Sequence, residues 1–413
     1  MQKILISTMV IATLLSGIII PNTPKAEAER VEPVVDNTNN LVTSVTTSFK
    51  DIKGHWAESV IAKANEMKLI TGYADGTFRP DRQITRAEFA AILSRSTKLQ
   101  KVTGENPFPD MKGNWADSAV TQLVAQGFIN PNDYPNGFSP NTKLTRYEEM
   151  KWLSNGLMKS NDSFKEALND TKNTLLPTPE ATRGEISIDK VPYIALVRGT
   201  GIITGFEDGS LKPKSTTTRA EVAAIILRYM NVEGKNANSY KDLNELREVG
   251  KTGSNLVSLT GYKYNTKTTF ADIINTPITL SNKSATVKIK RFILVDATSN
   301  KLSGIYSSLF PLKIADWQKG RYITYIQLDF TSLTDKPSVL MYAAGLKSTL
   351  LYFNKINDAD FVKSAGIENW PQSTANYFTK GKTKTVWTTW TMAPKGGANL
   401  INDRGAEINI QKD

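Results

Sequence analysis

The chain has no cysteine and only one histidine, His55, among its 413 residues. Without cysteine it has no disulfide framework, thiol nucleophile, cysteine zinc site or iron–sulfur cluster. A single histidine excludes a metal site built from several histidines, and a Ser-His-Asp triad anywhere away from His55. We therefore expect no metal, no cofactor and no catalytic residue of these kinds. Any catalysis would have to use carboxylates, lysine, tyrosine or serine.

Long apolar runs are also scarce, and the one we find lies at the N-terminus. Lys3 precedes apolar residues 4–20, and an A-x-A sequence follows at 26–28. This order is typical of a secretory signal, so we expect removal of residues 1–28 and a linker at 29–48. The alternative is an uncleaved membrane anchor, but the run is short and no basic stop-transfer cluster follows it. Secretion argues against a nucleic-acid partner and, after cleavage, against a membrane partner.

The chain has an ordinary globular composition but an uneven charge. Apolar residues make up 40% and charged residues 22%, and the length allows two or three domains. The net charge is +11, yet residues 29–239 carry 26 Lys and Arg against 25 Asp and Glu, whereas residues 240–413 carry 23 against 14. The basic C-terminal part favours anionic polymers such as cell-wall polysaccharide, nucleic acid or acidic lipid.

Three segments repeat one sequence frame, at 49–106, 107–160 and 188–231, with a connecting segment at 161–187. Each repeat has an amphipathic helix, a glycine-containing turn, an extended stretch ending in proline, and Thr-Arg-x-Glu opening a second helix. Because a helix–loop–helix unit of about 45 residues cannot bury its apolar face alone, we expect the three to pack together.

The Thr-Arg-x-Glu sequence predicts a capping box at each second helix. The threonine hydroxyl accepts from the backbone N–H three residues on, and the glutamate accepts from the threonine N–H. The boxes are Thr85 with Glu88, Thr145 with Glu148, and Thr218 with Glu221.

The arginine inside each box has no evident role in folding. Arg86, Arg146 and Arg219 fall in the first helical turn, where the positive end of the helix dipole makes a cation unfavourable by about 0.3–1 kcal/mol. One interpretation is an anion site, because free amides and a guanidinium both bind carboxylates. The other is a salt bridge to an acid such as Asp51 or Asp110. The pattern alone leaves both open.

These repeats resemble the S-layer homology domain, whose tandem triplets anchor exported proteins to the walls of Gram-positive bacteria. The resemblance covers roughly residues 49–230 and is most specific in repeats one and two, which share Phe-x-Asp, a tryptophan and a glycine-containing loop. It implies a pseudo-threefold domain around a central three-helix bundle. It also implies grooves that bind pyruvylated secondary cell-wall polysaccharide, with the pyruvate carboxylate meeting the arginine.

Carried over to this chain, the resemblance implies nine polysaccharide-binding residues: Asp51, Trp56, Gly72, Arg86, Asp110, Trp115, Arg146, Gly205 and Arg219. Repeat three lacks the Phe-x-Asp start and the tryptophan, so we expect it mainly to close the threefold core. The two tryptophans have an alternative as core residues, although aromatic faces also stack on sugars. The Asp-Gly turns carry too few acids for calcium loops.

Residues 255–413, reached through an expected linker at 232–254, carry strand signals. We expect strands at 256–264, 276–280, 285–296, 321–331, 338–343, 349–353, 385–392 and 406–410, and a short helix at 358–366. Val287 and Ile289 alternate with Lys288 and Lys290, as in a strand with one face in water. This number of strands predicts a β-sandwich.

One basic and aromatic stretch of this region has two interpretations. Alternating lysines are followed by two tryptophans: Lys380, Lys382, Lys384, Trp387 and Trp390. The stretch is either a glycan or polyanion contact, or an edge strand protected by lysine with its tryptophans in the core. We favour the edge strand.

Two functions fit the whole sequence. The first is a non-enzymatic surface protein, an S-layer or S-layer-associated protein, whose β-rich module faces outward and contacts other surface proteins or itself. The second is a wall-anchored enzyme that acts on glycan or peptidoglycan through paired carboxylates. No motif marks Asp316, Asp329 or Asp360 as such a pair, so we favour the first.

Overall fold

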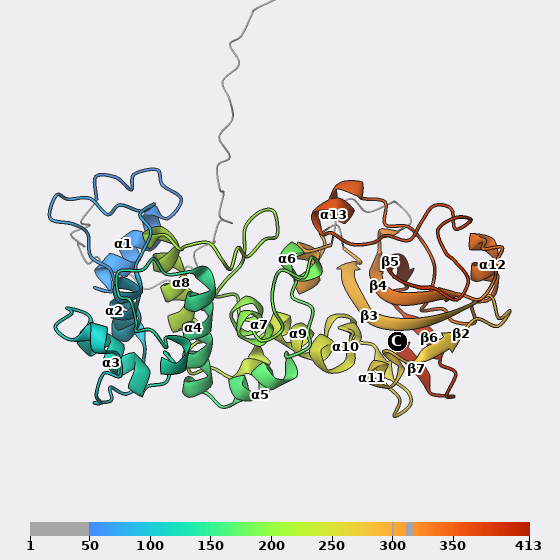
Figure 1. Ribbon diagram of the computed structural model, residues 1–413, viewed down its shortest axis with the longest axis horizontal. Coiled ribbons are helices and arrows are strands. Elements are labelled where there is room, and N and C mark those ends of the chain that lie inside the picture. The colour runs from blue at the N-terminus through green and yellow to red at the C-terminus, as the bar shows by residue number, and fades with distance from the viewer. Residues whose placement is uncertain (1–48, 300, 311–317) are drawn as a thin grey trace, which may run out of the picture.

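The computed structural model describes residues 49–299, 301–310 and 318–413. The expected signal at 1–28 and linker at 29–48 lie outside these residues. Figure 1 shows helices at one end of an elongated molecule and sheets at the other. The expected order, a helical region followed by a sheet-rich region, is confirmed. Of the helices described, none is long and apolar enough to cross a membrane.

Each repeat contributes two principal helices. They are α1 (Glu58–Glu66) and α2 (Arg86–Ser96), then α3 (Asp117–Ala125) and α4 (Arg146–Ser160), then α7 (Val191–Gly199) and α8 (Arg219–Val232). The three second helices begin with complete capping boxes, as the sequence predicts. Short 3₁₀ turns at Pro109–Met111 and Pro131–Asp133 flank α3.

Backbone hydrogen bonds join the three second helices in a ring. The N–H of Arg86 donates to the carbonyl of Thr142 at 3.0 Å, and that of Arg146 donates to Ser215 at 2.8 Å. The ring closes where the N–H of Arg219 donates to Arg82 at 3.0 Å. These first-turn amides have no partner within their own helix. Because the neighbouring repeats use them, they are not available to a ligand.

Two segments expected as connections are helices that pack into the core. Residues 161–187 contain α5 (Ser163–Asp170) and α6 (Pro179–Thr182). The expected linker at 232–254 contains a 3₁₀ turn at Ala237–Ser239 and α9 (Lys241–Thr252), which buries Leu243, Leu246 and Val249. The spacing of these three residues is a helical signal that the polar composition of the segment obscured.

The C-terminal region contains two antiparallel sheets. One has the order β2-β3-β4-β5, formed by β2 (Pro277–Thr279), β3 (Ala285–Ala297), β4 (Arg321–Ser332) and β5 (Thr383–Met392). The other has the order β1-β7-β6, formed by β1 (Lys263–Tyr264), β7 (Glu407–Lys412) and β6 (Gly396–Ile401). In β3 the expected alternation holds at the start, where Val287 and Ile289 are buried and Lys288 is exposed.

Several of the strand predictions are wrong. Residues 256–264 form α10 (Leu256–Thr260) before the two-residue β1, and 338–343 overlap α12 (Val339–Ala344). Apolar runs this short do not distinguish a strand from a buried helix. Residues 349–353 form no strand, whereas β6 was missed because it opens with two glycines. The expected helix is present as α13 (Ala359–Ser364), and the short elements α11 (Phe270–Ile273) and Ile305–Ser308 complete the region.

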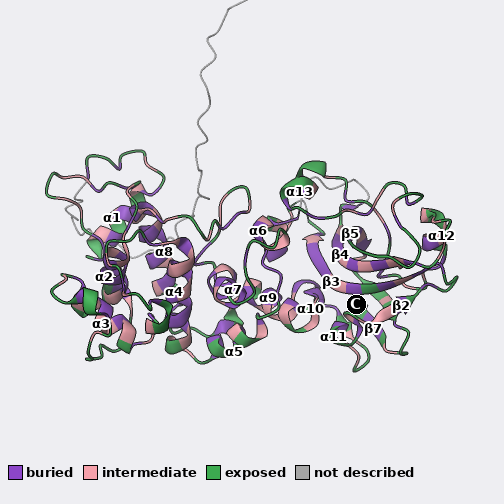
Figure 2. Ribbon diagram, in the orientation of Figure 1, coloured by how far each residue is buried: buried purple, intermediate pink, exposed green. Residues whose placement is uncertain are grey.

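The helical region and the sheets share a continuous core. Ile293 and Val295 of β3 join the same buried cluster as the repeats, whereas Phe292 and Leu294 join a second cluster with Ile408 of β7. Adjacent residues of a strand face opposite sides, so β3 contributes to both clusters. Figure 2 shows buried residues continuing from α7 and α9 to β3. The two halves of the chain are therefore packed against each other.

The lysine-rich stretch agrees with the edge-strand interpretation at all but one position. β5 is the last strand of its sheet, Lys384 is exposed and Trp387 is buried. Lys380 pairs with Asp335 at 2.8 Å. Trp390 differs, because it is only half-buried and belongs to neither core cluster.

A buried carboxyl in α4 makes the stability of the fold depend on pH. Glu149 is completely buried and accepts a hydrogen bond from the Thr217 hydroxyl at 2.9 Å. Burial raises its pKa from 4.5 to about 7, although nearby Arg146 opposes the shift. Between these two values the unfolded carboxyl has lost its proton while the folded one keeps it. Stability therefore falls as pH rises from about 4.5 to 7.

We predict that Glu149→Gln removes this dependence, because the amide cannot ionise. Relative to wild type, the free energy of unfolding of the variant should be higher by on the order of 1–3 kcal/mol at pH 8 and nearly unchanged at pH 4. Urea unfolding of both proteins at the two pH values measures the difference. An equal difference at pH 4 and pH 8 would contradict the assignment.

Candidate functional site

In repeats one and two, the aspartate of the Phe-x-Asp start fixes the turn that precedes the second helix. The Asp51 carboxylate accepts from the N–H groups of Phe78 at 2.8 Å and Arg79 at 2.7 Å. Burial alone would raise the pKa of Asp51, but these two hydrogen bonds lower it overall. Arg79 has φ 57°, a left-handed conformation that is costly for a non-glycine residue. The aspartate thus stabilises a strained turn.

Repeat two uses the same arrangement. The Asp110 carboxylate accepts from the N–H groups of Phe138 at 3.0 Å and Ser139 at 2.7 Å, and Ser139 has φ 53°. Asp51 and Asp110 are therefore engaged by their own turns. Neither forms the salt bridge to a box arginine that the sequence suggested.

Repeat three also has an acid in this position, so the expectation that it lacks one is wrong. The buried Glu180 of α6 accepts from the N–H groups of Leu211 at 3.0 Å and Lys212 at 2.8 Å, and Lys212 has φ 48°. The signal was Thr178-Pro179-Glu180, which parallels Phe108-Pro109-Asp110. It lies before the expected start at 188, because extra residues separate it from α7.

Each box arginine bonds the turn of the next repeat around the ring. Arg86 Nη1 donates to the carbonyl of Phe138 at 2.9 Å, and Arg146 Nε donates to Leu211 at 2.9 Å. Arg219 Nε closes the set by donating to Phe78 at 2.9 Å. These carbonyls belong to the residues whose N–H groups the acids hold. Asp51 therefore shares its turn with Arg219 of repeat three and not with Arg86 of its own repeat.

Two of the three arginines pair with the capping glutamate of the next repeat. Arg86 Nε lies 2.8 Å from Glu148 Oε1, and Arg146 Nη1 lies 3.2 Å from Glu221 Oε1. The equivalent acid for Arg219 is Glu88, which pairs with Arg82 instead. Burial lowers the pKa of Arg219, which is 6% exposed and bonds backbone carbonyls.

Each arginine also faces an aromatic ring of the neighbouring turn. The guanidinium carbon lies 5.0 Å from the ring centroid of Tyr134 for Arg86, 4.8 Å from Phe206 for Arg146, and 4.9 Å from Tyr73 for Arg219. Separations of this size give favourable cation–π contacts. The three interfaces therefore repeat one chemistry, with a different balance of charge in each.

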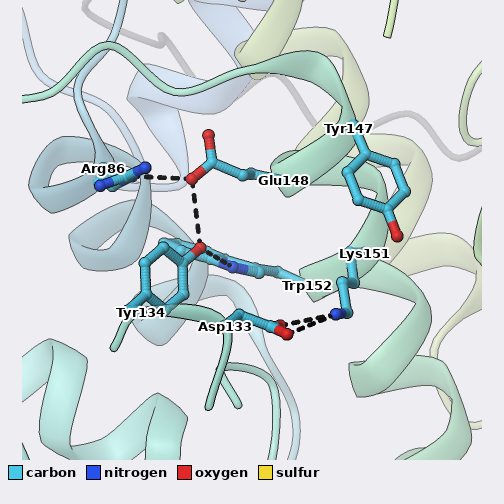
Figure 3. Close-up of a pocket in the computed structure, with 7 residues that line it drawn as sticks. All are labelled: Arg86, Asp133, Tyr134, Tyr147, Glu148, Lys151 and Trp152. Atoms are coloured by element: carbon cyan, nitrogen blue, oxygen red, sulfur yellow. Dashed lines mark hydrogen bonds and ion pairs between the residues drawn. The ribbon is translucent and has the colours of Figure 1, made fainter. Parts of the chain in front are cut away.

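The interface at Arg86 contains a cavity of about 240 Å³, which we call the Arg86 cavity (Figure 3). Its walls are Arg86, Asp133, Tyr134, Tyr147, Glu148, Lys151 and Trp152. Lys151 pairs with Asp133 at 2.7 Å, and the Tyr134 hydroxyl donates to Glu148 at 3.3 Å. Burial raises the pKa of Tyr134, which keeps the phenol protonated. Two cations and two carboxylates make this cavity nearly neutral.

The interface at Arg219, which we call the Arg219 cluster, is more basic. The guanidinium carbons of Arg79, Arg82 and Arg219 lie 4.0, 5.7 and 4.9 Å from the centroid of Tyr73. Asp75 pairs with Arg79 at 2.9 Å, and Glu88 pairs with Arg82. Three cations therefore meet at one aromatic ring, against the two carboxylates that pair with them and Asp51 at the same turn.

The remaining predicted site residues divide into exposed and structural positions. Trp56 is 40% exposed and Trp115 is 67% exposed, so the core alternative is wrong for both, yet neither lines the Arg86 cavity. Gly72 has a structural role, because a Cβ there would lie 2.1 Å from the Phe49 ring. Gly205 has φ 90° and belongs to the repeat-three turn.

Comparison with known proteins matches the repeats. The family model of the S-layer homology domain matches residues 48–90, 107–148 and 186–223. A cellulosome-anchoring protein of Acetivibrio thermocellus is 36% identical over 129 residues, 30% of this chain and 28% of that protein. An S-layer protein of Bacillus anthracis is 27% identical over 268 residues, 60% of this chain and 30% of that protein.

A further relative carries the name of an enzyme. An uncharacterised cell wall amidase of Bacillus anthracis is 31% identical over 154 residues, 37% of this chain and 29% of that protein. The chain spans less than a third of the length of each of these three relatives.

We predict that Glu180→Ala destabilises the protein by about 2–3 kcal/mol. The change removes the acceptor of two N–H groups in a buried turn and leaves both without a partner. Glu185→Ala is the control, because Glu185 pairs with Arg183 at the surface. Urea unfolding of both variants measures the difference, and equal stabilities would refute the role given to Glu180.

Proposed function

We propose that this chain, which carries three S-layer homology domains and is a cell-surface protein associated with the cell wall, is anchored by polysaccharide bound between its repeats. The observation that carries the proposal is the repeated interface, in which an arginine of one repeat faces an aromatic ring of the next. Guanidinium groups bind carboxylates, and aromatic faces stack on sugar rings. One relative is named a cellulosome-anchoring protein, and this name agrees with an anchoring role.

The gathering of three arginines favours the Arg219 cluster as the place for an acidic group. The Arg79 guanidinium lies 4.0 Å from the Tyr73 ring centroid, and both Arg79 and its partner Asp75 are about half exposed. A pyruvate ketal on the polysaccharide would supply a carboxylate that the clustered guanidinium groups can bind. The Arg86 cavity, nearly neutral and lined by Tyr147 and Lys151, would hold uncharged sugar. This order reverses the expectation that repeat three mainly closes the core.

We propose a structural or interaction role for residues 255–413, as in an S-layer or S-layer-associated protein. The competing role, a wall-anchored enzyme, requires two carboxylates on either side of a substrate. Asp329 is occupied by Lys290 at 3.6 Å and Thr385 at 2.6 Å, which disfavours it as a catalytic acid. Asp316 lies outside the described residues. We also propose a pseudo-threefold arrangement of the repeats and a sandwich of the two sheets.

We predict that Arg79→Gln in the full chain weakens binding to purified wall five- to tenfold, equivalent to about 1–1.4 kcal/mol. Lys151→Gln should weaken it less, because Lys151 lines the nearly neutral Arg86 cavity, which we assign to uncharged sugar. The exposed Lys112→Gln in repeat two is the control and should bind as wild type. Sedimentation with wall material before and after removal of its polysaccharide measures retention. Equal retention of wild type on stripped wall would refute polysaccharide anchoring. If Arg79→Gln is retained on intact wall as fully as wild type, the acidic group of the polysaccharide does not bind at the Arg219 cluster.

A further inference from the structure

A second cavity, of about 350 Å³, lies in the C-terminal region between the end of β5, the start of β6 and residues 348–352. Its lining contains aromatic, hydroxyl and cationic side chains: Tyr262, Arg321, Ser348, Thr349, Tyr352, Trp390 and Thr391. Among the described residues that line it there is no carboxylate. The cavity belongs to none of the interfaces between repeats.

Two aromatic rings form one wall of this cavity. Tyr352 and Trp390 are stacked, with centroids 4.1 Å apart and planes at 13°. Tyr352 is 37% exposed, Trp390 is half-buried, and neither is part of the two core clusters. A flat aromatic surface at the wall of an open cavity suits the apolar face of a sugar ring.

A fixed cation also lines this cavity. Arg321, at the start of β4, donates from Nε to the hydroxyl of Thr391 at 2.9 Å, so its guanidinium is held at the cavity. Arg321 belongs to the part of the chain with 23 basic and 14 acidic residues. An anionic group on the ligand would be attracted to this end of the cavity.

We propose that this cavity binds an acidic sugar residue, with its ring on the Tyr352–Trp390 stack and its acid group at Arg321. Ser348 and Thr349 also line the cavity, and their hydroxyls are held by hydrogen bonds to the backbone of Asn399 at 2.8 and 3.4 Å. The described lining has no carboxylate pair of the kind that hydrolyses glycosides, and the proposal concerns binding alone. The proposal does not rest on wall anchoring by the repeats, because it uses other residues in another part of the molecule.

The test is calorimetric titration of the full chain with trigalacturonate, and with maltotriose as its neutral counterpart. Wild type should bind trigalacturonate more tightly than maltotriose. Trp390→Ala should weaken binding of both at least fivefold, because it removes the stack. Arg321→Gln should remove the preference for the acidic sugar and leave maltotriose binding nearly unchanged. Raising the salt concentration should reproduce the effect of Arg321→Gln on wild type.

Two matched controls separate this cavity from other surfaces. Leu340→Ala removes an exposed apolar side chain from α12, and Lys382→Gln removes an exposed cation close to β5. Both should bind as wild type. If Trp390→Ala does not fold, Tyr352→Leu tests the same stack from a loop position. The proposal fails if wild type binds neither sugar, or if the folded stack variants bind as wild type.

Discussion

The packing of the three repeats depends on a carboxylate that fixes each turn and an arginine that reaches it from the neighbouring repeat. The acid holds two N–H groups of a turn whose second residue is strained, with φ between 48° and 57° at Arg79, Ser139 and Lys212. The carbonyl beside that residue then accepts from the arginine. The arginine contact depends on the carboxylate contact, because the carbonyl is in position to accept only when the carboxylate holds the turn. The turn of one repeat and the helix start of another are thus stabilised together.

This arrangement changes how an anion would be bound. One of the two interpretations of the sequence was a helix N-terminus with free amides, supported by an arginine. Instead the amides of Arg86, Arg146 and Arg219 already donate to carbonyls of neighbouring repeats. A ligand would meet side chains: guanidinium faces, aromatic rings and Lys151. Because each interface takes its parts from two repeats, one repeat alone would not form a site.

Local signals were predictable from the sequence and long-range partners were not. The capping boxes and strands β3, β4 and β5 follow from four-residue patterns and from alternation, which depend on neighbours in the chain. Glu180 was missed because extra residues separate it from α7 and it is not an aspartate. The contact of Arg219 with Phe78 spans 141 residues, and no repeat pattern states which turn an arginine reaches. The Tyr352–Trp390 stack likewise joins a loop predicted as a strand to the one tryptophan of β5 outside the core.

The shared core has a consequence for how two binding regions would act together. α9 packs on α7, and Arg198 of α7 donates to Ser308 next to the sheets at 3.0 Å. Gly209, in the repeat-three turn, lies so close that a Cβ would be 2.7 Å from the Ser308 carbonyl. If a flexible linker joined two binding sites, each site could bind its ligand independently. The effective concentration of the second site near a polymer bound at the first would then depend on the length of the linker. Here the packed helices hold the repeats and the C-terminal cavity at a fixed separation, so both could engage one polymer only where its spacing matches.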